Sequence, residues 1–267
     1  MKTLSASSLS LYSDCSLKWK FRYIDKINKF EASIHLIYGS AIHKALEKLN
    51  LSLAHKKNEL EDVFQDFYDE WNKQIKDYNI SPNKYSNQLF EMGINALEKF
   101  YNEKVDYELI GAETKFKVPI IYPDGKKDQE YELYGLIDAI VKRKNEIMII
   151  DYKTSKESYN RFKLDTSLQL AIYAYAFRQM LKAGKFPNIK KDIEDYISYY
   201  VLIKDYDTLD GDIKMQRKKI TDKHLNRMFY IIQTSIKGIK EGIFLPNYAS
   251  MCNYCEFKQE CLEFGGK

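Results

Sequence analysis

YELYGLIDAIV, at residues 131–141, and EIMIIDYKT, at residues 146–154, are two runs of strand length separated by a polar turn at residues 142–145. Both are apolar enough to predict neighbouring antiparallel strands buried in a core. Each run carries an aspartate, Asp138 or Asp151, where an apolar residue would otherwise continue. An ionised carboxylate in such a run is costly unless it is paired or bound to a cation. Both aspartates therefore need a partner.

A lysine and two later polar residues supply candidate partners. Because side chains alternate along a strand, Asp151 and Lys153 are expected on the same face. Two acids and a lysine at a sheet edge predict a hard-cation site beside a fixed positive charge, the arrangement that phosphodiester hydrolysis needs. Gln169 and Tyr173 lie four residues apart in a predicted helix, so they share one helix face and could both reach this site.

The order of three short motifs identifies a family resemblance. GLID at residues 135–138, DYK at 151–153 and QLAIY at 169–173 together resemble the PD-(D/E)XK nuclease superfamily, and more narrowly its RecB-like exonuclease branch. Ile137 stands where the family name has proline, a departure common in this branch. The resemblance implies an α/β fold with a restriction-endonuclease-like core, a central mixed sheet flanked by helices, and a helical insertion. It also implies that Asp138, Asp151, Lys153, Gln169 and Tyr173 are catalytic.

A histidine before the core extends the resemblance. Gly39 opens a predicted helix whose buried stripe is Ile42, Ala45, Leu46 and Leu49, and His43 lies off that stripe. A lone histidine at a helix start is most often a satisfied surface or core residue. RecB-like nucleases, however, carry a Gly-x-x-x-His motif whose histidine helps to hold the metal. The resemblance thus implies an Mg²⁺ or Mn²⁺ site formed by His43, Asp138, Asp151 and the main-chain carbonyl of Tyr152.

Further strands and helices complete the expected architecture. Residues 109–121 alternate at period two and predict a strand joined to the next by the turn at 123–125, and residues 195–206 predict another. Glu113 lies in the first of these strands, either near the metal, as in similar nucleases, or as an exposed glutamate. Helices are expected from Ser5, over 59–104 as scaffold, over 166–183 and over 221–241. Residues 214–219, KMQRKK, are expected to form a solvated loop that could contact phosphates.

Composition sets the class of protein. With 45% hydrophobic and 30% charged residues among 267, the chain is expected to be globular and able to bury a substantial core. A net charge of +4 permits a nucleic-acid partner. Neither a membrane-spanning run of roughly 18 apolar residues nor a signal-peptide pattern is present, so a cytoplasmic location and no membrane partner are expected. The sequence contains no phosphate-binding loop of the GxxxxGK[ST] type for ATP.

The alternation of basic and aromatic residues at 18–23, KWKFRY, has two interpretations. It could neutralise phosphates and stack on the bases of a single strand. Alternatively, Trp19 and Tyr23, four residues apart, pack into the core while the lysines extend over the surface.

All four cysteines fit one metal-binding scheme, with Cys15 near the start and Cys252, Cys255 and Cys261 within ten residues near the end. In a reducing compartment, metal binding is favoured over disulfides. The spacing resembles the iron-sulfur nucleases of the AddB and CRISPR-associated exonuclease type, in which a [4Fe-4S] cluster clamps the chain ends together. Zn²⁺ is the main alternative, and unliganded buried cysteines are a third.

These features predict a single nuclease domain over residues 1–267. It comprises a cluster segment at 1–36, a helical region at 37–108, the nuclease core at 109–206 and a C-terminal helix and cluster segment at 207–267. The resemblance implies a metal-dependent exonuclease acting on single-stranded DNA or DNA ends, in recombination, repair, phage DNA processing or CRISPR adaptation, with a helicase or recombination partner acting in trans. A non-catalytic nucleic-acid-binding module and a structure-specific endonuclease are the alternatives. Strand polarity and oligomeric state stay open.

Overall fold

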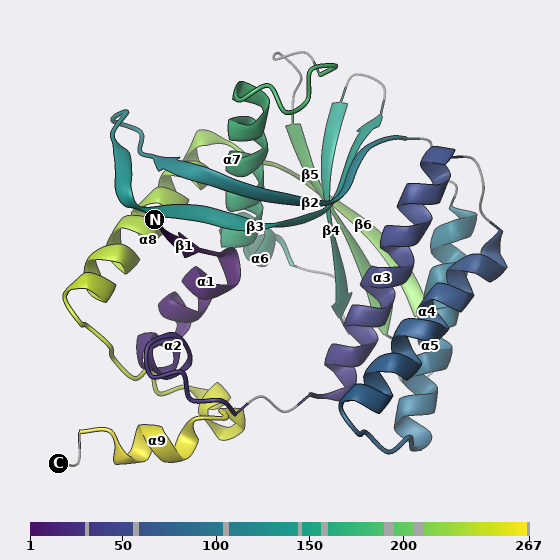
Figure 1. Ribbon diagram of the computed structural model, residues 1–267, viewed down its shortest axis with the longest axis horizontal. Helices are drawn as coiled ribbons and strands as arrows, with labels where there is room; N and C mark the ends of the chain where they lie inside the picture. Colours follow the sequence, from purple (N-terminus) through teal and green to yellow (C-terminus); the bar gives the residue numbers. More distant parts are fainter. Residues whose placement is uncertain are drawn as a thin grey trace.

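A mixed β-sheet forms the centre of the protein and helices flank it in the computed structural model (Figure 1). The structure describes residues 1–29, 32–55, 59–103, 107–143, 146–155, 160–189, 195–204 and 211–265. The strands are β1 (Lys2–Leu4), β2 (Glu108–Ile121), β3 (Lys127–Arg143), β4 (Glu146–Ser155), β5 (Asp195–Lys204) and β6 (Gly211–Lys219). The helices are α1 (Ala6–Asp14), α2 (Ser16–Tyr23), α3 (Ile34–His55), α4 (Leu60–Asp77), α5 (Lys84–Asn102), α6 (Arg161–Thr166), α7 (Leu168–Lys182), α8 (Asp222–Lys240), the 3₁₀ helix η1 (Ser250–Tyr254) and α9 (Lys258–Glu263).

The long strand β3 organises the sheet. It pairs antiparallel with β2 along one edge, and on the other edge it pairs in turn with β1, which is parallel, and with β4, which is antiparallel. The sheet continues from β4 to β5 in parallel and from β5 to β6 in antiparallel pairing. The predicted antiparallel pairing of β3 with β4 is confirmed, whereas residues 144 and 145 of the predicted turn lie outside the described residues.

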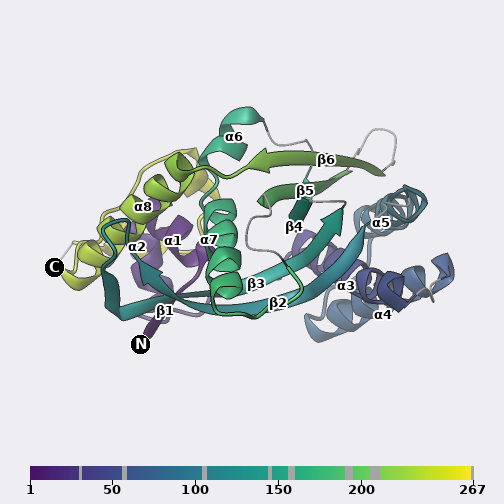
Figure 2. The same cartoon turned by 90° about the horizontal axis from the view of Figure 1, so that it is seen from above.

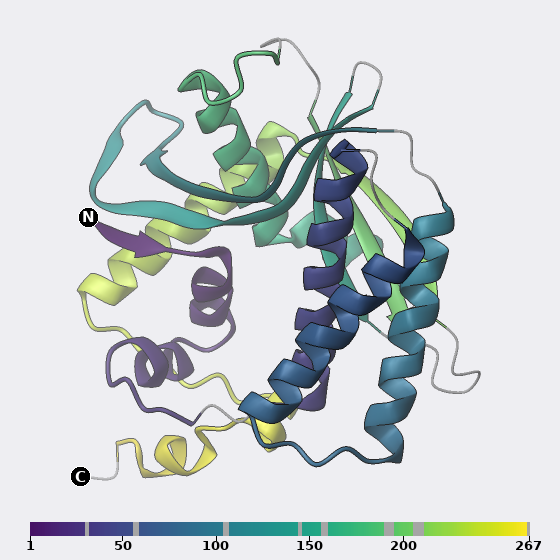
Figure 3. The ribbon, with the colours of Figure 1, turned by 45° about the vertical axis from the view of Figure 1, so that its right-hand side comes forward.

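Alternating side chains of β4 enter two separate cores, which explains why residues 147–150 are all apolar. Ile147 and Ile149 belong to the core formed with α1, α7 and α8, and α7 lies across β2 and β3 (Figure 2). Met148, Ile150 and Tyr152 belong to the core formed with α3, α4 and α5, which stand side by side (Figure 3). The face of β4 that a residue occupies therefore decides which helices it meets.

The predicted helices are present, with shifted boundaries. The stripe of α3 is fully buried as expected, but the helix begins at Ile34, five residues before Gly39. The helix expected over 166–183 starts at Leu168, because Ser167 is extended and caps it by accepting a hydrogen bond from the N–H of Leu170. In α4, Phe67 and Trp71 are buried, while Tyr68 is exposed.

The loop expected over residues 214–219 is wrong, since these residues belong to β6 and pair with β5. The density of lysine and arginine that favours a loop is also typical of an edge strand, where charged side chains discourage pairing with another chain. The strand predicted over 195–206 is confirmed as β5 up to Lys204, and residues 205 and 206 lie outside the described residues.

The two ends of the described chain pack against each other (Figure 1). Leu17 and Phe21 of α2 form a small core with Phe257, and Lys18 forms an ion pair of 2.7 Å with Glu256. Trp19 is buried and its indole N–H donates to Ser8 Oγ at 2.8 Å. Trp19 and Lys18 thus follow the packing interpretation of residues 18–23, although the Tyr23 side chain is exposed.

Among the helices in the described ranges, none combines the length and apolar character needed to cross a membrane.

Candidate active site

The two aspartates lie where β3 and β4 part. The last pair of the β3–β4 ladder joins Ala139 to Ile150, so Asp138, one residue before Ala139, and Asp151, one residue after Ile150, lie just beyond it. Beyond the end of this ladder, the N–H of Tyr152 donates to Asp138 Oδ2 at 2.8 Å. Both carboxylates are buried, with 7% of Asp138 and 1% of Asp151 exposed. The separation of the two strands therefore creates a buried polar site in the middle of an otherwise apolar part of the sheet.

Asp151 binds the predicted lysine and glutamine. Lys153 Nζ lies 2.9 Å from Asp151 Oδ1 and 2.7 Å from Oδ2, and Gln169 Nε2 donates to Oδ1 at 3.2 Å. Gln169 Nε2 also lies 2.9 Å from the hydroxyl of Tyr173 and donates to it. The expected juxtaposition of the DYK strand with one face of the QLAIY helix is thus found, with α7 presenting both side chains to the end of β4.

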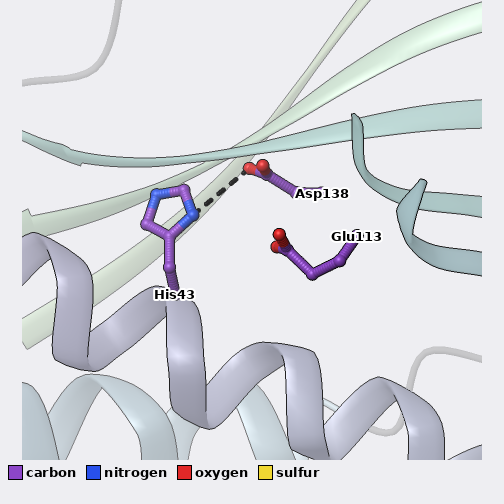
Figure 4. A group of neighbouring side chains, drawn as sticks. All are labelled: His43, Glu113 and Asp138. Atoms are coloured by element: carbon purple, nitrogen blue, oxygen red, sulfur yellow. Dashed lines mark ion pairs between the residues drawn. The ribbon is translucent and has the colours of Figure 1, made fainter. Parts of the chain in front are cut away.

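A second set of donors converges on the other side of Asp138. His43 from α3, Glu113 from β2 and Asp138 from β3 each offer one atom, and these atoms lie within 4.8 Å of one another (Figure 4). His43 Nδ1 is 3.5 Å from Asp138 Oδ2. Carboxylates with an imidazole are donors suited to a divalent cation such as Mg²⁺ or Mn²⁺.

Glu113 reaches this site through an unusual backbone. Its φ is 43°, in the left-handed region, and it lies between the pairs Ala112–Ala139 and Thr114–Ile137, opposite Asp138. A left-handed non-glycine residue costs about 1–3 kcal/mol and persists only where its surroundings over-determine it. The sequence left open whether Glu113 lies near the metal or is an exposed strand glutamate. The structure brings its carboxylate to the donor group, although no sequence signal marks the strained conformation.

Burial changes the acid–base behaviour of the group. It raises the pKa of both Asp138 and Asp151, against the opposing effects of the Tyr152 N–H and Lys153. Burial, followed by the charge of Asp138, raises the pKa of Glu113 to about 7. Burial also lowers the pKa of His43, which favours the neutral imidazole that binds metals. These shifts are those of a site that lacks compensating positive charge.

The residues fit a divalent cation in a second respect. Asp151 Oδ2 is buried and accepts no hydrogen bond of ordinary geometry from the described residues, although Lys153 lies close to it. The ring of His43 hydrogen-bonds to the main chain of Tyr152, which places that peptide beside the donors. A buried carboxylate oxygen paired with Lys153, an adjacent main chain and three convergent side chains together offer the donors that a hard cation takes.

The four cysteines, which come from the two ends of the sequence, lie together at a second site. Cys15 caps the start of α2, where its Sγ accepts from the N–H of Lys18, and the other three lie in or beside η1 and α9. All four line one cavity of about 110 Å³, together with apolar side chains of the end-to-end core. The expected convergence of the N- and C-terminal cysteines is therefore found.

The structure thus combines a mixed sheet with two buried acids and a lysine at the point where two strands separate, an arrangement suited to metal-dependent hydrolysis. The chain belongs to the PD-(D/E)XK nuclease superfamily, whose family model matches residues 3–262. The family resemblance seen in the motifs is thereby confirmed at the level of the nuclease superfamily.

Two curated relatives match part of the chain. The RecB subunit of the RecBCD enzyme from Borreliella burgdorferi is 29% identical over 188 aligned residues, which cover 55% of this chain and 15% of RecB. The CRISPR-associated exonuclease Cas4 of Francisella tularensis subsp. novicida is 24% identical over 137 residues, covering 51% of this chain and 59% of Cas4. The match thus spans a small part of the first relative and little more than half of the second.

A solved structure supports the fold. A putative exonuclease from Eubacterium rectale superposes with a TM-score of 0.56 over 95% of this chain and 87% of its own, at 14% identity. At this identity the likeness speaks for the fold alone.

Proposed function

We propose that the chain is an Mg²⁺- or Mn²⁺-dependent DNA exonuclease that degrades single-stranded DNA from an end. The observation that carries the proposal is the convergence of His43, Glu113 and Asp138 beside the Asp151–Lys153 pair. The name of the Cas4 relative, a CRISPR-associated exonuclease, supports the choice of an exonuclease over a structure-specific endonuclease.

The metal would be held by His43, Asp138, Asp151 and the carbonyl of Tyr152, with Glu113 as a further ligand. A bound Mg²⁺ or Mn²⁺ supplies Lewis-acid stabilisation of the phosphate and lowers the pKa of a coordinated water. Asp138 is oriented for this task by the N–H of Tyr152, and His43 by its hydrogen bond to the same residue's main chain. The main chain of a single residue, Tyr152, thus contacts both ligands.

Lys153 would act beside the metal. Its ammonium forms an ion pair with Asp151, which fixes its position, and 25% of its side chain is exposed, so that a substrate could reach it. A compact positive charge at this position can orient the attacking water and stabilise the negative charge that develops on the phosphate. Gln169 fixes the Asp151 carboxylate, and burial raises the pKa of Tyr173, which keeps its hydroxyl protonated and able to donate to the DNA or a water.

The cysteines would hold a [4Fe-4S] cluster that stabilises the fold without taking part in hydrolysis. The proposal is supported by the convergence of all four cysteines on one cavity of about 110 Å³. Thiolates accept either metal, so elemental analysis decides between them.

The RecB and Cas4 names supply the biological frame of the proposal. The chain would process DNA ends in recombination or repair, in phage DNA processing, or in CRISPR adaptation, with a helicase or recombination partner acting in trans. The RecB relative is a subunit of a larger enzyme by its name, and it supports such a partner for this chain.

The decisive experiment combines metal, substrate and variant. Purified protein is given Mn²⁺ with end-labelled linear single strands, circular single strands and linear duplex. Trimming of the linear single strand and sparing of the circle is expected, with activity lost in Asp138→Asn and kept in Asp124→Asn, whose carboxylate lies in the exposed β2–β3 turn. Cleavage of the circle favours the endonuclease. Metal-independent DNA binding without cleavage favours the non-catalytic module.

The cluster is tested on the same preparation. Anaerobically purified protein is analysed for iron, sulfide and zinc, and its visible absorbance is recorded. About four irons per chain are expected for one cubane cluster. A colourless protein with one zinc per chain supports the alternative.

A further inference from the structure

Asn50 is a polar residue enclosed in the apolar core between α3 and the sheet. Its side chain is fully buried. Its Nδ2 donates to the hydroxyl of Tyr152 at 2.8 Å, and its Oδ1 accepts from the hydroxyl of Tyr107 at 2.8 Å. Both ends of the amide are therefore engaged by tyrosines from other segments, and the unit Tyr107–Asn50–Tyr152 forms a hydrogen-bonded relay.

The relay joins the elements that carry the candidate metal ligands. Asn50 lies seven residues after His43 in α3, two helical turns further along a similar face. Tyr107 directly precedes β2, the strand of Glu113, and Tyr152 follows Asp151 in β4. A fixed distance between Asn50 and the two hydroxyls therefore fixes how the helix of His43 sits on the strands of the acids.

Tyr152 transmits this constraint to the ligands. Its ring is held edge-on between His43, at a centroid distance of 6.2 Å, and Phe100, at 5.8 Å. Its main chain donates to Asp138 and accepts from His43. The hydroxyl that Asn50 holds thus belongs to the residue that touches both ligands.

The chemistry of the relay points to positioning. An amide in an apolar core costs free energy unless all its hydrogen bonds are made, and an aliphatic residue of similar size would fill the space without that condition. What the amide adds is a single allowed placement of Tyr152. Hydrogen-bonded groups behind metal ligands commonly change metal affinity by about 10- to 100-fold.

We infer that Asn50, with Tyr107, is a positioning residue that sets the geometry of the metal site through Tyr152. The inference rests on the proposed metal-dependent function and adds residues that lie outside the ligand set. It predicts that breaking the relay weakens metal binding and lowers kcat, while KM for DNA is unchanged because the side chains of Asn50 and Tyr152 are buried.

The test measures Mn²⁺ binding in the absence of DNA. Isothermal titration at one pH compares the wild type with Asn50→Leu, Tyr152→Phe and the double variant, and thermal unfolding without metal is recorded for each. Each single variant is expected to weaken Mn²⁺ binding at least tenfold, and the double variant no more than the worse single one, since both cut the same bond.

Tyr175→Phe is the matched control. The Tyr175 hydroxyl accepts from the N–H of Ile121 at 2.9 Å and donates to the carbonyl of Pro119 at 2.8 Å, so its loss removes comparable bonds from another core. It is expected to lower the melting temperature and to leave the Mn²⁺ affinity unchanged. A merely structural role for Asn50 would give the same pattern as this control.

Two outcomes overturn the inference. Wild-type-like Mn²⁺ affinity, within twofold, in folded Asn50→Leu and Tyr152→Phe would show that the relay serves stability alone. If Asn50→Leu does not fold, Tyr152→Phe and Tyr107→Phe decide by the same criterion. A wild type that binds no Mn²⁺ would instead overturn the proposed function, and the inference with it.

Discussion

Glu113 combines a strained backbone with a charge that the fold does not neutralise, so its replacement separates stability from activity. Asparagine tolerates the left-handed conformation better than glutamate and removes the charge. In metal-free protein, Glu113→Asn is expected to raise the free energy of unfolding by about 1 kcal/mol and to lower Mn²⁺-dependent cleavage at least tenfold. Denaturant unfolding in EDTA and end-label cleavage measure both. Glu108→Asn, in the same strand with an ordinary backbone, should change neither; a Glu113→Asn protein that is less stable but fully active would refute the assignment.

The raised pKa of Glu113 is expected to make the metal-free protein less stable as the pH rises. Glu113 titrates at about 7 in the folded protein against 4.5 in an unperturbed glutamate. The folded state therefore holds its proton more tightly, and this stability is present below pH 4.5 and is lost as the pH rises through about 7. Asp138 and Asp151 shift in the same direction.

Thermal unfolding at pH 5 and pH 7.5 checks the direction of this pH dependence of stability. The melting temperature without metal is expected to be higher at pH 5, and Mn²⁺ should stabilise the protein mainly at pH 7.5, because metal binding requires deprotonated carboxylates. Equal stabilisation by Mn²⁺ at both pH values would contradict it.

Lys153 is expected to matter for turnover more than for metal binding. Removing its charge takes away the stabilisation of the developing phosphate charge, so Lys153→Ala should lower cleavage at least ~100-fold with the fold intact. Lys126→Ala, in the exposed β2–β3 turn, is the control. Single-turnover rates at saturating Mn²⁺ measure the effect. Near-native turnover in purified Lys153→Ala would remove this residue from the mechanism.

At the scale of single residues, the sequence predicts those site residues that stand out against the local pattern. Asp138 and Asp151 stand out because acids interrupt apolar runs, and Gln169 and Tyr173 because their spacing follows the helix. Asn50 carries no such mark, since a single polar residue at the edge of an apolar stripe is ordinary in any helix. The strained φ of Glu113 depends on the register between β2 and β3, and no local pattern encodes that register.

At the scale of elements, hydrophobic patterns predicted most of the strands and helices. β2 was predictable from its period-two alternation, β3 and β4 from their apolar runs, and α3, α4, α5, α7 and α8 from their helical periodicity; β5 was predicted as a strand as well. β6 was not predictable because its pairing with β5 outweighs a basic sequence, and β1 is three residues long, too short for a pattern. Tertiary pairing, not local propensity, forms these two strands.

The contact between α1 and α8 depends on the absence of one side chain. Gly238 of α8 faces the hydroxyl of Tyr12 in α1, where a Cβ would collide with that oxygen, and the hydroxyl donates to the carbonyl of Ile243 at 2.8 Å. Gly238→Ala is therefore expected to push Tyr12 aside, break this bond and destabilise the protein by about 1–3 kcal/mol.

Hydrogen exchange and thermal unfolding measure the damage, with α1 and α2 expected to lose protection first. Tyr12→Phe removes the colliding oxygen, so the double variant Gly238→Ala/Tyr12→Phe should be no less stable than Tyr12→Phe alone. Additive losses in the double variant would show that the collision is not the cause.

At the scale of the molecule, the proposed cluster and the protein's own contacts share the task of joining the chain ends. Cys261→Ser is expected to lower the melting temperature and to increase hydrogen exchange in residues 1–29 before it affects β3 and β4. The core of Leu17, Phe21 and Phe257 and the Lys18–Glu256 ion pair should keep the ends associated at low temperature. Ser250→Ala, beside the cysteines, is the control. Early loss of protection at Asp138 and Asp151 would contradict this order.

The packing of α1 and α2 against the C-terminal segment also imposes a delay on folding during synthesis. Tyr12 and Ile243 are bonded across 231 positions, so the first helices leave the ribosome long before their partner segment exists. At ~5–20 residues per second this delay is roughly 10–50 s. During that interval Leu17 and Phe21 lack Phe257, the apolar partner that buries them in the finished protein. The speed of translation therefore governs how long the earliest part of the chain remains a target for chaperones and aggregation.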